Sequence, residues 1–136
     1  MKIALILPNT IDKASFVDYY TDVFKENKNI DWIYITWQRD KKLQENYFGK
    51  KVYEFNLKSP IANSKIKKIF HYKFFANFVK KVLKAENVDY IIIFTIQGGV
   101  FLHEFLKKYF DKKYIFDIRD YSPLYPFFKK NVEELI

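Results

Sequence analysis

Two carboxylates and an arginine fall within four positions in the stretch FDIRDYSP (116–123). Asp117 ends an apolar run, where a carboxylate needs a cation or several N–H donors to stay charged. Arg119 can supply a bidentate partner, so Asp117 is predicted to brace a loop with Arg119 or with backbone donors. Asp120 follows the run, and its oxygens can cap the next turn or accept a hydrogen bond from a ligand hydroxyl. This stretch is therefore predicted either to stabilise a loop or to bind a ligand.

The only adjacent glycines of the chain, Gly98 and Gly99, follow Gln97 after another apolar run. Glycines between a strand and a helix let a ligand approach the main chain, and the N–H groups at the helix start favour anionic or polar groups. A tight turn that needs positive φ is the alternative. Residues 97–99 are thus candidate binding residues.

The loop PNTIDKAS (8–15) follows the first apolar run and contains no glycine. Without glycine its backbone cannot approach a pyrophosphate closely, which argues against a dinucleotide site of the G-x-G-x-x-G type. Asn9 is a candidate substrate contact in the wall of a binding site. The alternative is that this loop only caps the next helix through Asp12 or Ser15.

The sequence offers no set of metal ligands. His71 and His103 are its only imidazoles, no His, Asp and Glu spacing is typical of a metal site, and there is no cysteine. We expect His103 to be an ordinary helical residue, and a substrate contact by His71 is an alternative. The lack of cysteine favours a reducing compartment.

The segment SKIKKIFHYKFF (64–75) mixes four lysines with aromatic residues. Lys65, Lys67 and Lys68 could contact anionic lipid headgroups while phenylalanines insert. The alternative is a surface helix packed on a sheet by its phenylalanine face, and the spacing of apolar doublets favours such packing from Phe74 onward. Membrane contact is therefore predicted for the three lysines.

Apolar periodicity predicts an α/β domain. The expected strands cover residues 2–8, 31–37, 51–58, 89–96 and 113–118. The expected helices cover residues 15–28, 64–86 and 99–110. Nearly continuous apolar strands joined by helices predict a doubly wound, mostly parallel, Rossmann-like five-stranded sheet of order 3-2-1-4-5, with helices on both faces.

This topology predicts where a ligand binds. In doubly wound sheets the site lies beyond the carboxyl ends of the strands, at the switch point between the first and fourth strands. Residues 8–15, 97–99 and 119–125 should therefore converge at one edge. The polar stretch 38–50 is expected to be a loop.

Length and composition fit one domain of 136 residues with a formal charge of +8. Such a charge favours nucleic acid, an anionic membrane or a phosphorylated substrate, although the lysine-rich coding of an AT-rich genome explains it equally well. Nucleic acid ranks last because no basic motif interleaved with aromatics falls on a strand. No run approaches the roughly 20 apolar residues of a membrane span, so a soluble or peripheral protein is expected.

The segment from VDYIIIFTIQGG to DIRDYSP (88–123) resembles GT-B glycosyltransferases with a family-four-like N-terminal domain. It shares an apolar strand, a short polar loop, a helix, a second strand and the pattern D-x-R-D-x-x-P. KIALILP (2–8) fits the start of that domain. The likeness covers most of the chain, and its most specific part is D-I-R-D-Y-S-P. The likeness is greatest to bacterial enzymes that build capsule, O-antigen or other surface polysaccharides.

The resemblance implies retaining transfer of a sugar from a nucleotide-sugar to a polysaccharide or lipid-linked acceptor, without metal or other cofactor. Asp120 would be catalytic, and Arg119, residues 97–99 and Asn9 would bind substrate. PNTIDKAS departs from the glycine-rich first loop common in these enzymes, which makes donor contact from this loop doubtful. The implied location is the cytoplasm, including the inner membrane face.

Residues 1–136 would then be the acceptor-side domain alone, without the C-terminal domain that binds the nucleotide-sugar. We expect such a domain to be inactive by itself and able to form a homodimer through its interdomain face. The alternative is a non-catalytic α/β module that binds or assembles with an anionic partner.

Overall fold

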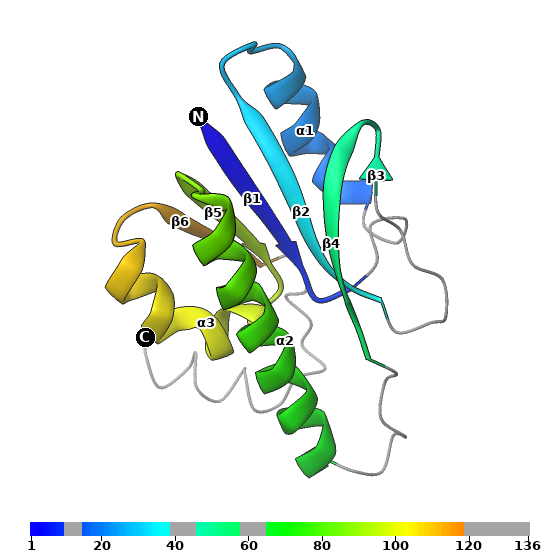
Figure 1. Ribbon diagram of the computed structural model, residues 1–136, viewed down its shortest axis with the longest axis vertical. Coiled ribbons are helices and arrows are strands. Elements are labelled where there is room, and N and C mark those ends of the chain that lie inside the picture. Colours follow the sequence, from blue (N-terminus) through cyan, green and yellow to red (C-terminus); the bar gives the residue numbers. More distant parts are fainter. Residues whose placement is uncertain (10–14, 39–45, 58–64, 119–136) are drawn as a thin grey trace.

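The computed structural model describes residues 1–9, 15–38, 46–57 and 65–118 (Figure 1). The strands are β1 (Lys2–Leu7), β2 (Asp31–Gln38), β3 (Asn46–Tyr47), β4 (Lys50–Asn56), β5 (Tyr90–Phe94) and β6 (Tyr114–Asp117). The helices are the 3-10 turn η2 (Ser15–Val17), α1 (Asp18–Lys25), α2 (Lys65–Glu86) and α3 (Ile96–Tyr109).

One sheet runs through the molecule in the order β3-β4-β2-β1-β5-β6. Its five long strands are parallel and have the predicted order 3-2-1-4-5. The central strand β1 pairs with β2 on one side and with β5 on the other. The predicted α/β doubly wound fold is confirmed.

The sixth strand, β3, was not predicted. It lies in the stretch 38–50 that was expected to be a loop, and it pairs antiparallel with β4. Phe48 and Gly49 join the two strands with φ of 49° and 76°. Two consecutive positive φ values are typical of the type I′ turn, whose twist matches that of a hairpin.

Helices cover both faces of the sheet (Figure 1). Ala4 and Ile6 of β1 face a core shared with α2 and α3. Leu5 and Leu7 face a second core that includes Val17 of η2 and Phe24 of α1. This alternation explains why β1 is almost continuously apolar, since both of its faces are buried.

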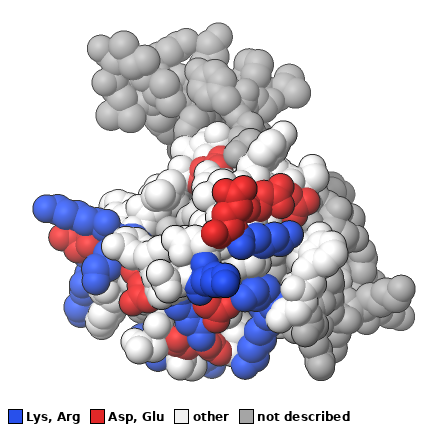
Figure 2. Space-filling model, turned by 90° about the horizontal axis from the view of Figure 1, so that it is seen from above, with Lys and Arg blue, Asp and Glu red and all other residues white. Residues whose placement is uncertain are grey.

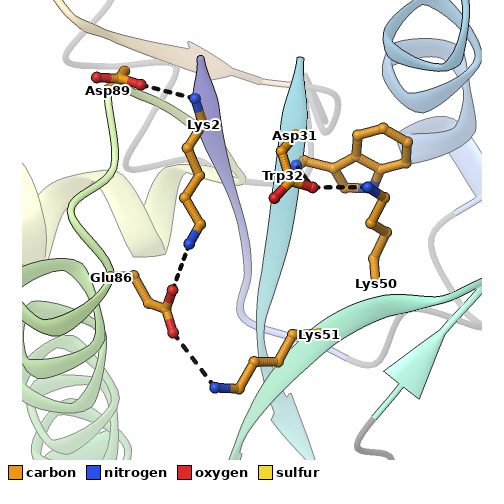
Figure 3. Close-up of polar contacts among 7 residues, drawn as sticks. All are labelled: Lys2, Asp31, Trp32, Lys50, Lys51, Glu86 and Asp89. Atoms are coloured by element: carbon orange, nitrogen blue, oxygen red, sulfur yellow. Dashed lines mark hydrogen bonds and ion pairs between the residues drawn. The ribbon is translucent and has the colours of Figure 1, made fainter. Parts of the chain in front are cut away.

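Charged side chains tie the elements together at the amino ends of the strands (Figure 3). The Lys2 backbone N–H donates to Asp89 Oδ2 at 2.8 Å, and its ammonium group donates to Glu86 Oε2 at 2.6 Å. Lys51 reaches the other oxygen of Glu86 at 3.5 Å. Glu86 therefore fixes the last turn of α2 against two strands.

A further ion pair lies at the same ends of the strands. Lys50 Nζ is 2.7 Å from Asp31 Oδ1 and 4.2 Å from the centroid of the Trp32 ring. In the view from above, blue and red side chains lie interspersed on this side of the molecule (Figure 2). A uniform basic surface of the kind that binds a phosphate backbone is not visible on this face.

We expect the free energy of unfolding to fall as the pH is lowered toward 3. Lys50 lowers the pKa of Asp31 and Lys2 lowers that of Glu86, each by a hydrogen bond, from ordinary values of 3.8 and 4.5. A carboxyl whose pKa is lower in the folded state stabilises the fold above its unfolded pKa, and this contribution disappears as pH falls through the folded pKa. Urea unfolding at a series of pH values measures it.

The matched variants for this measurement exchange lysines for methionine, which keeps the apolar stem. Lys2→Met with Lys50→Met should flatten the pH dependence between about pH 5 and 3. Lys107→Met with Lys108→Met, on the exposed end of α3, should leave it unchanged. The same slope in both double variants would contradict a role for the two ion pairs.

Candidate functional site

The carboxyl ends of β1, β5 and β6 meet at one edge of the sheet because these neighbouring strands are parallel. The chain leaves β1 toward α1 on one face and leaves β5 toward α3 on the other. The predicted switch point between β1 and β5 is therefore present. Asn9, two residues after β1, is exposed at this edge.

The helix α3 begins at Ile96, three residues earlier than predicted. Residues 97–99 therefore form its first turn and not a loop before it. The N–H groups of a first turn have no partners within the helix and are available to a polar or anionic ligand. The side-chain contacts predicted for Gln97 and Gly98 lie outside the described residues.

Gly99 has a packing role. It is buried, and a Cβ at this position would lie 3.3 Å from Cε1 of Phe116. Since its φ is not positive, the tight-turn alternative does not explain this glycine. Gly99 lets the start of α3 lie close to β6, and in that way it shapes the edge.

Thr95, between β5 and α3, has a strained backbone. Its φ of 84° and ψ of 151° lie in a region that is essentially restricted to glycine and costs about 1–3 kcal/mol. Its N–H donates to the Asp117 carbonyl at 3.2 Å, whereas its buried hydroxyl oxygen has no hydrogen-bond partner among the described residues. Thr95 was not predicted as a site residue, because a threonine in the sequence does not indicate this backbone conformation.

A cavity of about 180 Å³ opens beside this edge. It is lined by Thr95, Gly99, Val100, His103, Phe116 and Ile118. The volume is below the roughly 300–1,000 Å³ of pockets that enclose a drug-sized ligand. The cavity can therefore receive one ring or one apolar face of a larger ligand.

The two histidines differ in their surroundings. His103 is half-exposed on α3, as expected, yet it borders the cavity with its ring 6.5 Å from that of Phe116. His71 lies on α2, where its buried Nδ1 has no hydrogen-bond partner among the described residues. His103 therefore lies nearer to the candidate binding residues at the carboxyl edge of the sheet than the sequence indicated.

Asp117 accepts a hydrogen bond from the hydroxyl of Tyr20, which lies on α1. Its carboxylate therefore faces α1, whereas the neighbouring Phe116 faces the cavity and α3. This contact agrees with a bracing role for Asp117, with Tyr20 as a partner that the sequence did not indicate. Arg119 and Asp120, predicted to bind substrate and to catalyse, lie outside the described residues.

The predicted membrane contacts fall on α2. Lys67 and Lys68 are exposed in its first two turns, and the side chain of Lys65 lies outside the described residues. The packing predicted from Phe74 onward is wrong at Phe74 itself, which is half-exposed, and correct for the buried Phe75. Neighbouring residues on a helix point about 100° apart, so this doublet is split between two faces.

No group of three or more histidines, aspartates or glutamates within the described residues is arranged to hold a metal ion. None of the helices found there combines the length and apolar character that crossing a bilayer requires. No family model, no curated protein and no solved structure matches the chain.

Proposed function

We propose that residues 1–136 are the acceptor-binding domain of a glycosyltransferase. The enzyme would transfer a sugar from a nucleotide-sugar to a polysaccharide or lipid-linked acceptor in the cytoplasm, at the inner membrane face. One observation carries the proposal: the pattern D-I-R-D-Y-S-P begins at the carboxyl end of β6, next to the switch point of a 3-2-1-4-5 sheet. Ligands of doubly wound sheets bind at this edge.

The chemistry of the edge suits a sugar. An acceptor ring has an apolar face that fits the cavity beside Phe116, and it has hydroxyl groups that can bond to the N–H groups at the start of α3. In this proposal Asp120 accepts a hydrogen bond from the attacking hydroxyl, and Arg119, Asn9 and residues 97–99 hold the acceptor. The donor binds to a separate domain, so the domain alone is inactive.

Saccharide titration of the ¹⁵N-labelled chain, followed by NMR, tests this proposal. We expect oligosaccharides of hexoses and N-acetylhexosamines to shift the amide signals of residues 95–100 and 116–118. Asp120→Asn should weaken binding by about tenfold or more, because a hydrogen bond to a charged group contributes about 1.5–3 kcal/mol.

Asp111→Asn is the matched control, since this exposed aspartate lies in the turn before β6, at the other end of that strand. It should leave binding and the melting temperature unchanged. If no saccharide moves the named signals, or if both variants weaken binding equally, an acceptor site at this edge is excluded.

A non-catalytic module for an anionic partner is the second candidate. The charge of α2 favours it, because this helix contains seven lysines and one glutamate, a formal charge of +6. Such a module would ignore saccharides, and its binding to an anionic partner would weaken steeply with added salt. The same NMR titration, repeated with an anionic polymer at two salt concentrations, separates the two functions.

A further inference from the structure

Helix α2 is longer than the strands it covers. Its 22 residues span about 33 Å, whereas the six residues of β1 span about 20 Å. Its last turn is fixed at the amino ends of the strands by the bond from Lys2 to Glu86. The first turns of α2 therefore extend past the carboxyl edge of the sheet, as Figure 1 shows.

The overhanging part and the turn that follows it carry exposed apolar side chains, which we call the outer row. The outer row consists of Ile66, Ile69, Phe70 and Phe74, which are between 49% and 70% exposed. Residues spaced by three and four lie on one side of a helix. The side that packs on the sheet is a different one, and it contains the buried Phe75 and Val79.

Positive charge borders the outer row. Lys67, three residues before Phe70, is exposed beside the outer row, and the ammonium group of Lys73 lies 5.9 Å from the centroid of the Phe70 ring. The only acidic residue of α2, Glu86, is at its far end. An apolar row with lysines around it matches a surface that offers hydrocarbon below a layer of negative charge.

Burial in a partner is needed to explain such a row. Scattered exposed apolar residues are normal, but four large ones within three turns mark an interaction surface. A bilayer with anionic headgroups fits both properties, because apolar side chains insert below the headgroups while lysines stay among them. An uncharged apolar partner would leave the lysines without a role.

We propose that the outer row of α2 and its lysines dock this domain on an anionic membrane surface. The helix lies along the interface, and the carboxyl edge of the sheet, with its candidate site, then lies close to the membrane. This docking does not depend on transferase activity. It is measured without sugar, so its failure and the failure of the proposed function are distinguishable.

Co-sedimentation of the 136-residue chain with vesicles tests the docking. We expect binding to mixed phosphatidylglycerol and phosphatidylcholine vesicles, and at least tenfold weaker binding to phosphatidylcholine alone. Ile66→Ser with Phe70→Ser should weaken binding to the mixed vesicles by about tenfold or more. Lys67→Gln with Lys73→Gln, the two lysines that flank the outer row, should weaken it too and reduce its salt dependence.

Two double variants serve as matched controls. Tyr19→Ser with Val23→Ser removes exposed apolar side chains of α1, and Lys107→Gln with Lys108→Gln removes exposed lysines of α3. Both should bind like the unchanged chain. Circular dichroism checks that every variant is folded, and exposed positions such as these usually affect stability little.

A gain of signal provides a second measurement. In Phe70→Trp the new indole should be quenched by brominated lipids, whereas the native Trp32 and Trp37 are buried in the protein. Absence of quenching, or equal binding to both vesicle types, overturns the proposal. Self-association that the Ile66→Ser and Phe70→Ser variant abolishes, without vesicle binding, would assign the outer row to an interface between copies instead.

Discussion

Replacing Trp37 with alanine should lower the free energy of unfolding by about 3–5 kcal/mol, the usual cost of deleting a buried tryptophan. Trp37 is 1% exposed at the carboxyl end of β2. Its ring stacks on that of Phe75 at 5.5 Å and meets the rings of Phe55 and Tyr72 edge-on. Its ring N–H donates to the Leu57 carbonyl at 2.9 Å. One side chain thus joins α2, β2 and the end of β4.

Urea unfolding followed by circular dichroism measures the effect. Trp37→Phe should cost less than Trp37→Ala, because it keeps an aromatic ring and loses only volume and the bond to Leu57. Tyr19→Ala is the control, since Tyr19 is 72% exposed and its loss should change stability by no more than about 0.5 kcal/mol. A Trp37→Ala cost as small as that of the control would show that the aromatic cluster does not hold α2 on the sheet.

Thr95→Gly should be more stable than Thr95→Ala by about 1–2 kcal/mol. Alanine removes the buried hydroxyl but keeps the Cβ that makes φ of 84° and ψ of 151° unfavourable. Glycine also removes the Cβ, which recovers about 1–3 kcal/mol of strain and costs about 0.4–1 kcal/mol through the greater freedom of the unfolded chain. The difference between the two variants therefore measures the backbone strain less the cost of the greater freedom of glycine in the unfolded chain.

Asn87→Gly is the matched control for Thr95. Asn87 follows α2 with φ of 51°, a left-handed conformation that asparagine tolerates at helix ends. Its replacement should change the free energy of unfolding by only a few tenths of a kcal/mol. Equal stabilities of the Gly and Ala variants would argue against backbone strain at Thr95. They would also remove the reason to regard this residue as part of a site.

The strand order could be predicted because it follows from a few apolar runs in the sequence. Runs such as residues 2–8 and 89–96 are apolar on both faces, which only inner parallel strands require, and right-handed crossovers then leave few arrangements. The strand β3 could not be predicted in this way. It has two residues, and its turn uses Phe48 before Gly49 in place of the usual Asn-Gly.

The sequence predicts at which edge of the sheet the candidate site lies, but not which side chains contact one another there. Topology alone places Asn9, the start of α3 and Asp117 at one edge. The bond between Tyr20 and Asp117 joins residues 97 positions apart, and only the packing of α1 against the sheet creates it. The contact of Gly99, in the first turn of α3, with Phe116 of β6 is likewise created by packing and could not be predicted from the sequence.

The outer row shows that an apolar residue in a helical pattern is not always a core residue. Phe74 and Phe75 are equally apolar, and periodicity places one of them on each side of α2. A sequence does not show where a helix extends beyond its sheet, so the exposed side looked like part of the packed one. The bond between Lys2 and Glu86, which fixes the last turn of α2 at the amino ends of the strands, supplies the missing information.

The pairing of β1 with β5 has a consequence for how the chain folds. The bond between Lys2 and Asp89 joins residues 87 positions apart, so the centre of the sheet cannot close until most of the chain has been synthesised. Contacts of such long sequence separation slow folding, because the entropy of loop closure is lost before the contact forms. Until then β4, β2 and β1 can form only part of the sheet, in which the edge of β1 that later pairs with β5 is uncovered. Folding of this domain should therefore be slow compared with that of helical proteins of its size.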